Sequence, residues 1–288
     1  LGSAQVGALT TAQIVVINTA DVAALSTAGI GGLNTGQVVA LTTAQVRVMG
    51  SAQVGALTTA QLIAMETSDV GALSISAVVG LSTAQVVALT TAQTGALGSA
   101  QVGVLLTSQV VALTSAEVAA LSTAGIAGLS TVQIPLLSNA QIGVLNSSQV
   151  STLSTAQIVA LTSAEVAALS TAGAIGLSSK QVAVMTSQLV ALSTADVAVL
   201  STAVIANLGT AQVVGLSTGQ AAALGAAQVG VLLTSQVVAL ESADVASLST
   251  AGVLGLTSVQ IPVLSTAQAA SLGSAQVGAL TTAQIVVI

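Results

Sequence analysis

Apolar and polar residues follow one another along this chain in a fixed order of eight positions. After Leu1, thirty-six consecutive octads run to Ile288, and one of them, residues 186–192, is a residue short. Position 1 is usually Ser, Thr, Gly or Asn, position 4 is usually Gln, and positions 5 and 8 hold large apolar residues. Because positions 5 and 8 are three apart, they share one face of a helix but fall on opposite faces of a strand. The pattern therefore predicts one short helix per octad.

Positions 1 and 4 together predict where each helix begins. Ser or Thr followed three residues later by Gln or Glu forms a capping box, in which each side chain satisfies a free amide of the helix start. Two acidic residues, Glu66 and Glu241, occupy the cap position itself. The other six stand at position 4, in the predicted first turn, where the helix dipole favours negative charge: Asp21, Asp69, Glu117, Glu165, Asp196 and Asp244. Positions 2 and 6 are expected to point outward, whereas small residues at positions 3 and 7 would let helices approach closely.

A β-solenoid with one short strand per octad is the alternative fold. Val, Ile and Thr are abundant and favour strands. However, a strand with position 5 inward would place the Leu of position 8 outside. Pro135 and Pro262, both at position 6, would disturb either structure, because proline removes a backbone donor.

The octads themselves repeat with a longer period of six octads. The acids Asp21, Asp69, Glu117 and Glu165 each stand six octads after the one before, and the octad after each of them lacks Gln. One copy, around residues 193–224, has only four octads. Losing two octads would preserve the register of the later octads if two octads made one coil. In addition, Gly at position 1 occurs only in odd-numbered octads, whereas octads that begin with Ser-Thr-Ala-Gly (STAG) are all even-numbered, as two alternating sides of a coil would require. We therefore predict an all-α solenoid of short capped helices, one per octapeptide, with about two octads per coil.

The domain organisation follows from the same repeat. Residues 1–288 are expected to form a single continuous octapeptide-repeat solenoid. Residues 1–17 recur without change at 272–288, so we expect the chain to be an excerpt of a longer array.

The composition limits the partners that the chain can have. Arg47 and Lys180 are the only basic residues against eight carboxylates, and charged residues make up 3% of the chain. Nucleic-acid binding, which depends on basic side chains, is therefore not expected. A transmembrane segment needs about 18–20 consecutive apolar residues, and Ser, Thr or Gln interrupts every octad. The expected surface of methyl, hydroxyl and amide groups favours association with other copies of the chain.

Catalytic chemistry has no evident basis in these residues. The chain has no His and no Cys, so no side chain is positioned by the pattern to activate a Ser or Thr nucleophile. Glu66 with Asp69, and Glu241 with Asp244, could be imagined as calcium ligands, but calcium takes six to eight oxygens. A role at helix starts is the simpler interpretation. We expect no enzyme activity, no small-molecule substrate, no cofactor, and no catalytic, cofactor-binding or metal-ligating residue.

Two resemblances extend this interpretation. Residues 41–49 and 81–89 resemble the opening helix of the repeats of TAL effectors, over nine residues each. The base-reading loop and second helix of those repeats have no counterpart, so DNA recognition does not carry over. The whole chain resembles the low-complexity Thr/Ala/Gln/Val repeat regions of large bacterial surface, adhesin-like or extracellular filament proteins. That resemblance implies secretion and a structural or adhesive role.

These observations predict a structural protein located outside the cell or on its surface. Its octads would stack into a solenoid that associates laterally into an extracellular filament or the stalk of an adhesin. The alternative is an ice-binding or other surface-binding solenoid that uses arrays of Ser and Thr.

Overall fold

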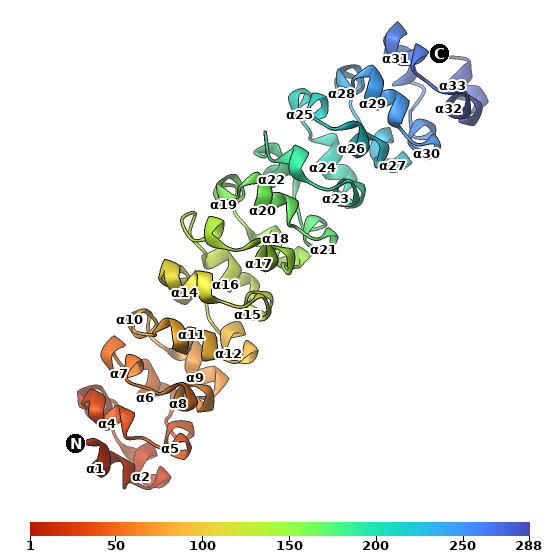
Figure 1. The fold of residues 1–288 in the computed structure, drawn as a ribbon. Coiled ribbons are helices and arrows are strands. Elements are labelled where there is room, and N and C mark those ends of the chain that lie inside the picture. Colours follow the sequence, from red (N-terminus) through yellow and green to blue (C-terminus); the bar gives the residue numbers. More distant parts are fainter. The chain divides into compact units, whose positions relative to one another are not determined.

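The structure, a computed structural model that describes residues 1–288, consists of short helices throughout (Figure 1). It contains 33 α-helices of four to six residues and three 3-10 turns, which together match the thirty-six octads, and it contains no strand. The predicted all-α fold with one helical segment per octad is confirmed. No helix combines the length and the apolar character that crossing a membrane requires.

The capping box begins the helices as predicted. In α11 (Thr83–Ala88), the hydroxyl of Ser82 accepts the N–H of Gln85 at 3.3 Å, and Oε1 of Gln85 accepts the N–H of Ser82 at 2.7 Å. The next residue, Leu89, has extended backbone angles (φ −58°, ψ 138°) and leads the chain into the following octad. Each octad thus has a polar start, a turn or so of helix, and an extended end.

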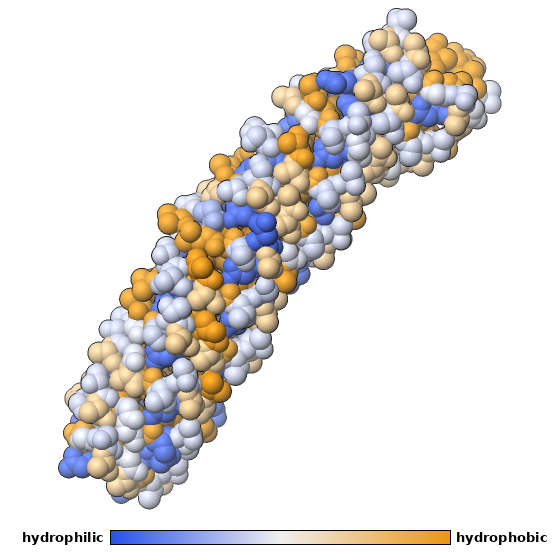
Figure 2. All heavy atoms as spheres, in the orientation of Figure 1, coloured by the Kyte–Doolittle hydropathy of each residue, from blue (hydrophilic) through white to orange (hydrophobic).

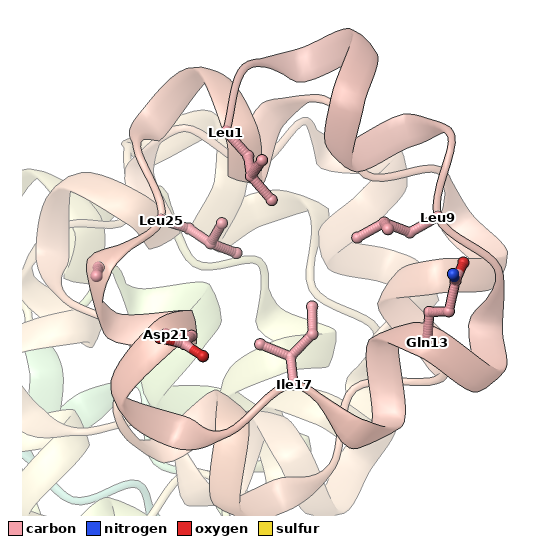
Figure 3. Close-up of a pocket in the computed structure, with 7 residues that line it drawn as sticks. Leu1, Leu9, Gln13, Ile17, Asp21 and Leu25 are labelled. Carbon is pink, nitrogen blue, oxygen red and sulfur yellow. The ribbon is translucent and has the colours of Figure 1, made fainter.

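The core consists of the apolar residues at positions 5 and 8. Val86 and Leu89, for example, are both buried. Figure 3 shows the position-8 side chains of the first coil, from Leu1 to Leu25, directed toward one another at the centre. The prediction that these two positions form the inward face is confirmed.

A coil contains three octads, so the predicted coil of two octads is wrong. Within each unit described below, the contacts between helices join those that are three octads apart. Four of the octads with a Gly cap, those that begin at Gly2, Gly50, Gly98 and Gly225, stack on an octad without Gln three positions later, so the two sets alternate between odd and even octads. Loss of two octads leaves the core filled, because every octad supplies inward side chains from the same two positions, 5 and 8. The six-octad period therefore corresponds to two coils of three.

Contacts divide the chain into two units, Leu1–Val144 and Leu145–Ile288. In each unit, helices three octads apart form three columns, which we name after their characteristic residues.

In the first unit, the glycine column contains α1 (Ser3–Gly7), α4 (Thr27–Gly31), α7 (Ser51–Gly55), α10 (Ile75–Val79), α13 (Ser99–Gly103) and α16 (Thr123–Gly128). The valine column contains α2 (Thr11–Val16), α5 (Thr35–Val39), α8 (Thr59–Ala64), α11, α14 (Thr107–Ala112) and η1 (Ile134–Leu136). The charged column contains α3 (Thr19–Ala24), α6 (Thr43–Arg47), α9 (Thr67–Ala72), α12 (Thr91–Gly95), α15 (Ser115–Ala120) and α17 (Asn139–Gly143).

In the second unit, the charged column contains α18 (Ser147–Thr152), α21 (Thr171–Ala174), α23 (Thr194–Val199), α26 (Thr218–Ala222), α29 (Ser242–Ser247) and α31 (Thr266–Ala270). The glycine column contains α19 (Thr155–Ala160), α22 (Ser179–Ala183), α24 (Thr202–Ala206), α27 (Ala226–Gly230), α30 (Thr250–Leu254) and α32 (Ser274–Ala279). The valine column contains α20 (Ser163–Ala167), η2 (Leu189–Ala191), α25 (Thr210–Val214), α28 (Thr234–Ala239), η3 (Ile261–Val263) and α33 (Thr282–Ile285).

The three 3-10 turns occur where an octad cannot complete an α-helical turn. Pro135 and Pro262 lie within η1 and η3, because a missing backbone donor is tolerated near the start of a short turn. The third turn, η2, belongs to the octad that is one residue short. The solenoid thus accommodates the two prolines by changing the type of turn.

Candidate functional site

The glutamine at position 4 links successive coils. In Gln93, Oε1 accepts the N–H of Thr90 at 2.9 Å and completes the capping box. The amide nitrogen of the same side chain donates to the carbonyl oxygens of Leu62 and Met65, both at 2.9 Å, 31 and 28 residues earlier. Both carbonyl groups lie at a helix end: that of Leu62 also accepts the N–H of Met65 at 3.1 Å, whereas that of Met65 lies beyond the last turn, where helix carbonyls lack an intrahelical partner. One side chain therefore satisfies the start of its own helix and the end of another.

The inter-coil bond recurs along both units. Gln85 donates to Val54 and Leu57 in the first unit, and Gln260 donates to Val229 and Leu232 in the second. Sequence analysis assigned glutamine only the capping role and missed this second one. The signal for it was the preference for Gln over Glu at position 4, because only Gln can donate.

Acidic residues interrupt this pattern, since an ionised carboxylate accepts hydrogen bonds but cannot donate them. Five of the six position-4 acids are buried: Asp69, Glu117, Glu165, Asp196 and Asp244. Asp69 instead accepts the hydroxyl of Thr43, 26 residues earlier, at 2.8 Å. In Glu117, Oε2 accepts the N–H of Thr114 at 2.6 Å, whereas Oε1 is buried without a hydrogen-bond partner.

Burial raises the pKa of two of these carboxyl groups. The pKa of Asp69 lies above its ordinary value of 3.8, chiefly because of desolvation; the negative charge of Glu66 adds to the shift, and the Thr43 hydrogen bond opposes it. The pKa of Asp244 is raised for the same main reason, with a smaller increase from the charge of Glu241 and an opposing backbone hydrogen bond from that residue. Both acids therefore hold a proton more readily in the folded chain than free in water.

The octads without glutamine pack more closely on the preceding coil. The Ser26 hydroxyl donates to the carbonyl oxygen of Leu1 at 3.1 Å, which satisfies a carbonyl group that no glutamine reaches. A methyl group added to Gly29 would lie 2.9 Å from that same oxygen. On Gly32, a methyl group would lie 2.4 Å from Cα of Ser3, so glycine is needed there to let the two backbones approach.

In the first unit, exposed apolar side chains at position 6 are concentrated in the valine column, whereas in the second unit Val159, Ile175 and Leu254 also expose apolar side chains at position 6 of the other two columns. We call the row in the valine column the valine ridge: Val15, Val39, Ile63, Val87 and Val111 in the first unit, and Val190, Val214, Val238 and Val286 in the second. Pro135 and Pro262 occupy the same position in their octads. The other exposed large apolar side chains of the first unit at positions 6 and 7, outside the valine column, are Val48, Val79 and Val144. Figure 2 shows apolar side chains at the surface among polar ones.

Charged side chains are kept apart from the valine ridge. In the first unit all of them belong to octads of the charged column: Asp21, Arg47, Glu66, Asp69 and Glu117. In the second unit, the valine column carries a charge only at Glu165 in α20, before the ridge begins at Val190. No ridge side chain in either unit shares its helix with a charged residue, and Lys180 lies in α22 of the glycine column.

A hollow of about 510 Å³ opens at the end of the first coil (Figure 3). It is lined by Leu1, Leu9, Gln13, Ile17, Asp21, Ala24 and Leu25. Gln37 is the counterpart of Gln13 one coil later, where it is buried and donates to the carbonyl oxygen of Leu9 at 2.6 Å. The residues that line the hollow are therefore of the kind that form contacts between coils.

The candidate calcium ligands do not converge. Glu66 is exposed and makes no cap hydrogen bond, while Asp69 is buried against Thr43. Likewise Glu241 makes no side-chain cap bond to its own helix, and Asp244 accepts the N–H of Glu241 at 3.2 Å. Within residues 1–288, no three His, Cys, Asp or Glu side chains are grouped so that they could hold a metal ion.

Comparison with known proteins identifies the repeat. The ALTTAQ repeat matches residues 14–47, 33–65, 62–99, 137–171, 189–226 and 237–274. No curated protein matches the chain. Each matched segment spans about four to five octads, and together the segments cover more than half of the 288 residues. The chain belongs to the ALTTAQ repeat family.

Proposed function

We propose that this chain is a structural segment of an extracellular filament or of the stalk of a surface adhesin, and that it acts by stacking coils and by associating with other copies. One observation carries this proposal. The inter-coil bond from glutamine has the same donor atom, an equivalent carbonyl acceptor and the same spacing of 28 residues in three successive octads, at Gln85, Gln93 and Gln101. A structure in which each repeat contacts mainly its neighbours can be lengthened without changing its core.

The nature of the surface supports an assembly role. Only ten side chains carry charge in 288 residues, so little electrostatic repulsion opposes contact between copies. The charged groups also lie in a minority of the octads. Assembly of such chains would depend on apolar and hydrogen-bonding contacts, which salt screens weakly.

The assembly is tested with the purified full chain. Sedimentation velocity and electron microscopy at 0.05 M and 1 M NaCl should show association that persists or increases at high salt. Dissociation at 1 M NaCl would contradict the proposed mechanism, and a monomer at all concentrations would contradict the proposed function. Surface location is tested separately, by protease treatment of intact source cells followed by immunoblotting for the repeat.

Ice binding is a second candidate, favoured by one observation. Exposed threonines recur at position 2 once per coil along the valine column, at Thr11, Thr35, Thr59, Thr83 and Thr107. They lie four residues before the ridge side chains, on the same helix face. Hydroxyl and methyl groups therefore alternate along this column. Thermal hysteresis of the soluble chain tests this candidate, and its absence would exclude it.

A further inference from the structure

We propose that the valine ridge is the surface through which two copies of this chain associate side by side. The inference rests on the proposed structural function and names the contact that would carry it. Its starting point is the position of the ridge side chains, which recur once per coil in helices that stack on one another.

The ridge side chains are uniformly and only partly exposed. From Val15 to Val111 their exposed fractions lie between 41% and 57%. Most position-6 residues of the glycine and charged columns in the first unit are Gly or Ala instead. There, a methyl group on Gly55 would lie 2.8 Å from the carbonyl oxygen of Gly80 in the next coil. Close packing between coils thus disfavours larger side chains at most of these positions in the first unit, and the valine column is where they project once in every coil.

The absence of charge favours an apolar contact at this surface. No Asp, Glu, Lys or Arg lies in the valine column of the first unit, or beside the ridge in the valine column of the second. Two ridges can therefore meet without desolvating an ionised group, which would oppose association. The exposed Thr hydroxyls beside them remain able to bond to water or to each other.

The spacing of the ridge identifies a second copy as the partner. A stable interface removes about 800 Å² from each partner, and one half-exposed valine per coil supplies only a small part of that area. A partner must therefore stay in contact over many coils and offer apolar groups at the same interval. Another copy of this solenoid does so by construction, because its ridge repeats with the same period of three octads.

Substitutions in the complete chain can test this contact. The ridge variant combines Val39→Thr, Ile63→Thr, Val87→Thr, Val111→Thr, Val214→Thr and Val238→Thr. The control variant makes six comparable changes at exposed apolar positions outside the ridge: Val48→Thr, Ile75→Thr, Val79→Thr, Val144→Thr, Ile175→Thr and Leu254→Thr. The control positions have exposed fractions of 38% to 56%, so both variants lose similar exposed apolar surface. Circular dichroism establishes that each variant is folded.

Sedimentation velocity over a concentration series gives the result. We expect the ridge variant to weaken association by at least tenfold, and the control variant to stay within about twofold of the unsubstituted chain, a tenfold change being about 1.4 kcal/mol. If the unsubstituted chain associates and the ridge variant does so equally well, the ridge assignment is wrong while the assembly function stands. If the unsubstituted chain does not associate, both fail. Equal weakening by both variants would also overturn the assignment, because the contact would then be general.

Discussion

The side-chain amide of Gln93 donates a 2.9 Å hydrogen bond to the carbonyl oxygen of Met65, 28 residues earlier in the chain. Both residues are buried. This bond joins a helix start in one coil to a helix end in the preceding coil, at a level where water cannot replace it. The inward apolar side chains fill each coil, while this polar contact fixes how one coil is placed on the next.

Replacing Gln93 by Glu removes the donor but keeps the acceptor that caps the helix. The carbonyl group of Met65 would then lose its partner in a buried setting, and that of Leu62 would keep only the N–H of Met65. Leaving a buried acceptor unsatisfied costs about 1–3 kcal/mol. We expect the midpoint of urea unfolding at pH 7, followed by circular dichroism, to fall accordingly.

The matched control is Gln13→Glu in the first coil. Gln13 accepts the N–H of Thr10 at 2.8 Å, as in any capping box, but it is exposed and its side-chain hydrogen bonds are all to Thr10. This change should alter stability little. Equal losses from the two substitutions would show that the inter-coil bond contributes nothing.

Glu117→Gln is the reverse change and should stabilise the chain. It keeps the shape of the side chain and replaces the buried, unpartnered Oε1 by a group that can donate. By analogy with Gln85 and Gln93, the acceptors would be the carbonyl groups 28 and 31 residues earlier. We expect a gain of about 1–2 kcal/mol at pH 7, measured by urea unfolding.

Glu66→Gln provides the control for the change in charge. Glu66 is exposed at a helix start and makes no side-chain cap bond. Its substitution should shift stability by less than about 0.5 kcal/mol, as for ordinary surface changes. A similar gain at both positions would attribute the effect to net charge instead of the inter-coil bond.

The raised pKa values of Asp69 and Asp244 predict a pH dependence of stability. Because their native pKa values exceed the ordinary 3.8, the folded chain binds these protons more tightly than the unfolded chain. Their contribution to the free energy of unfolding therefore increases as pH falls from the native pKa toward 3.8. It is complete below 3.8 and is lost as pH rises through the native pKa.

The double variant Asp69→Asn, Asp244→Asn isolates this contribution. Urea midpoints measured between pH 7 and pH 3.5 should show the unsubstituted chain gaining stability relative to the variant on acidification. A relative loss on acidification would mean that the native carboxylates are stabilised in their charged form, contrary to the effect of burial.

Gly80→Ala tests the close approach between coils of the glycine column. A methyl group at this position would lie 2.2 Å from the carbonyl oxygen of Ser51. The overlap must displace backbone, so we expect a loss of about 1–3 kcal/mol, measured by thermal or urea unfolding.

Gly278→Ala is the control, because a methyl group there meets no atom within 4 Å. Gly278 lies within α32, where Ala is the better helix former, and the change should stabilise by about 0.5–1 kcal/mol. The two substitutions should thus have opposite signs. Destabilisation by both would show that the backbone contact at Gly80 is not the cause of its effect.

The local structure could be predicted from the sequence because it depends on residues within one octad. The Ser82–Gln85 capping box and the burial of Val86 and Leu89 follow from the spacing of positions within the octad. The number of octads per coil could not be predicted in the same way. Because every octad has the same two inward positions, coils of two or three octads are equally consistent with the pattern. The occurrence of Gly caps in odd octads and of the STAG sequence in even octads favoured the wrong number.

The valine ridge was present in the sequence but could not be recognised there. Val15, Val39 and Ile63 stand in every third octad, and this spacing gains meaning only when a coil is known to contain three octads. The second role of glutamine was hidden for a similar reason. A capping box accounts fully for Gln at position 4 on its own, so nothing local required an acceptor in the preceding coil.

The shortened copy around residues 193–224 has four octads, which is not a multiple of the three octads in a coil, and this changes the column in which the exposed valines lie. In the second unit Val159 lies in the glycine column with Ala183 one coil later, whereas the ridge continues from Val190 in the valine column. Removing two octads has moved the apolar row to the adjacent column while leaving the interior filled. The number of octads therefore determines which column holds the exposed valines, and insertion or deletion of whole octads moves them to another column with no substitution in the core.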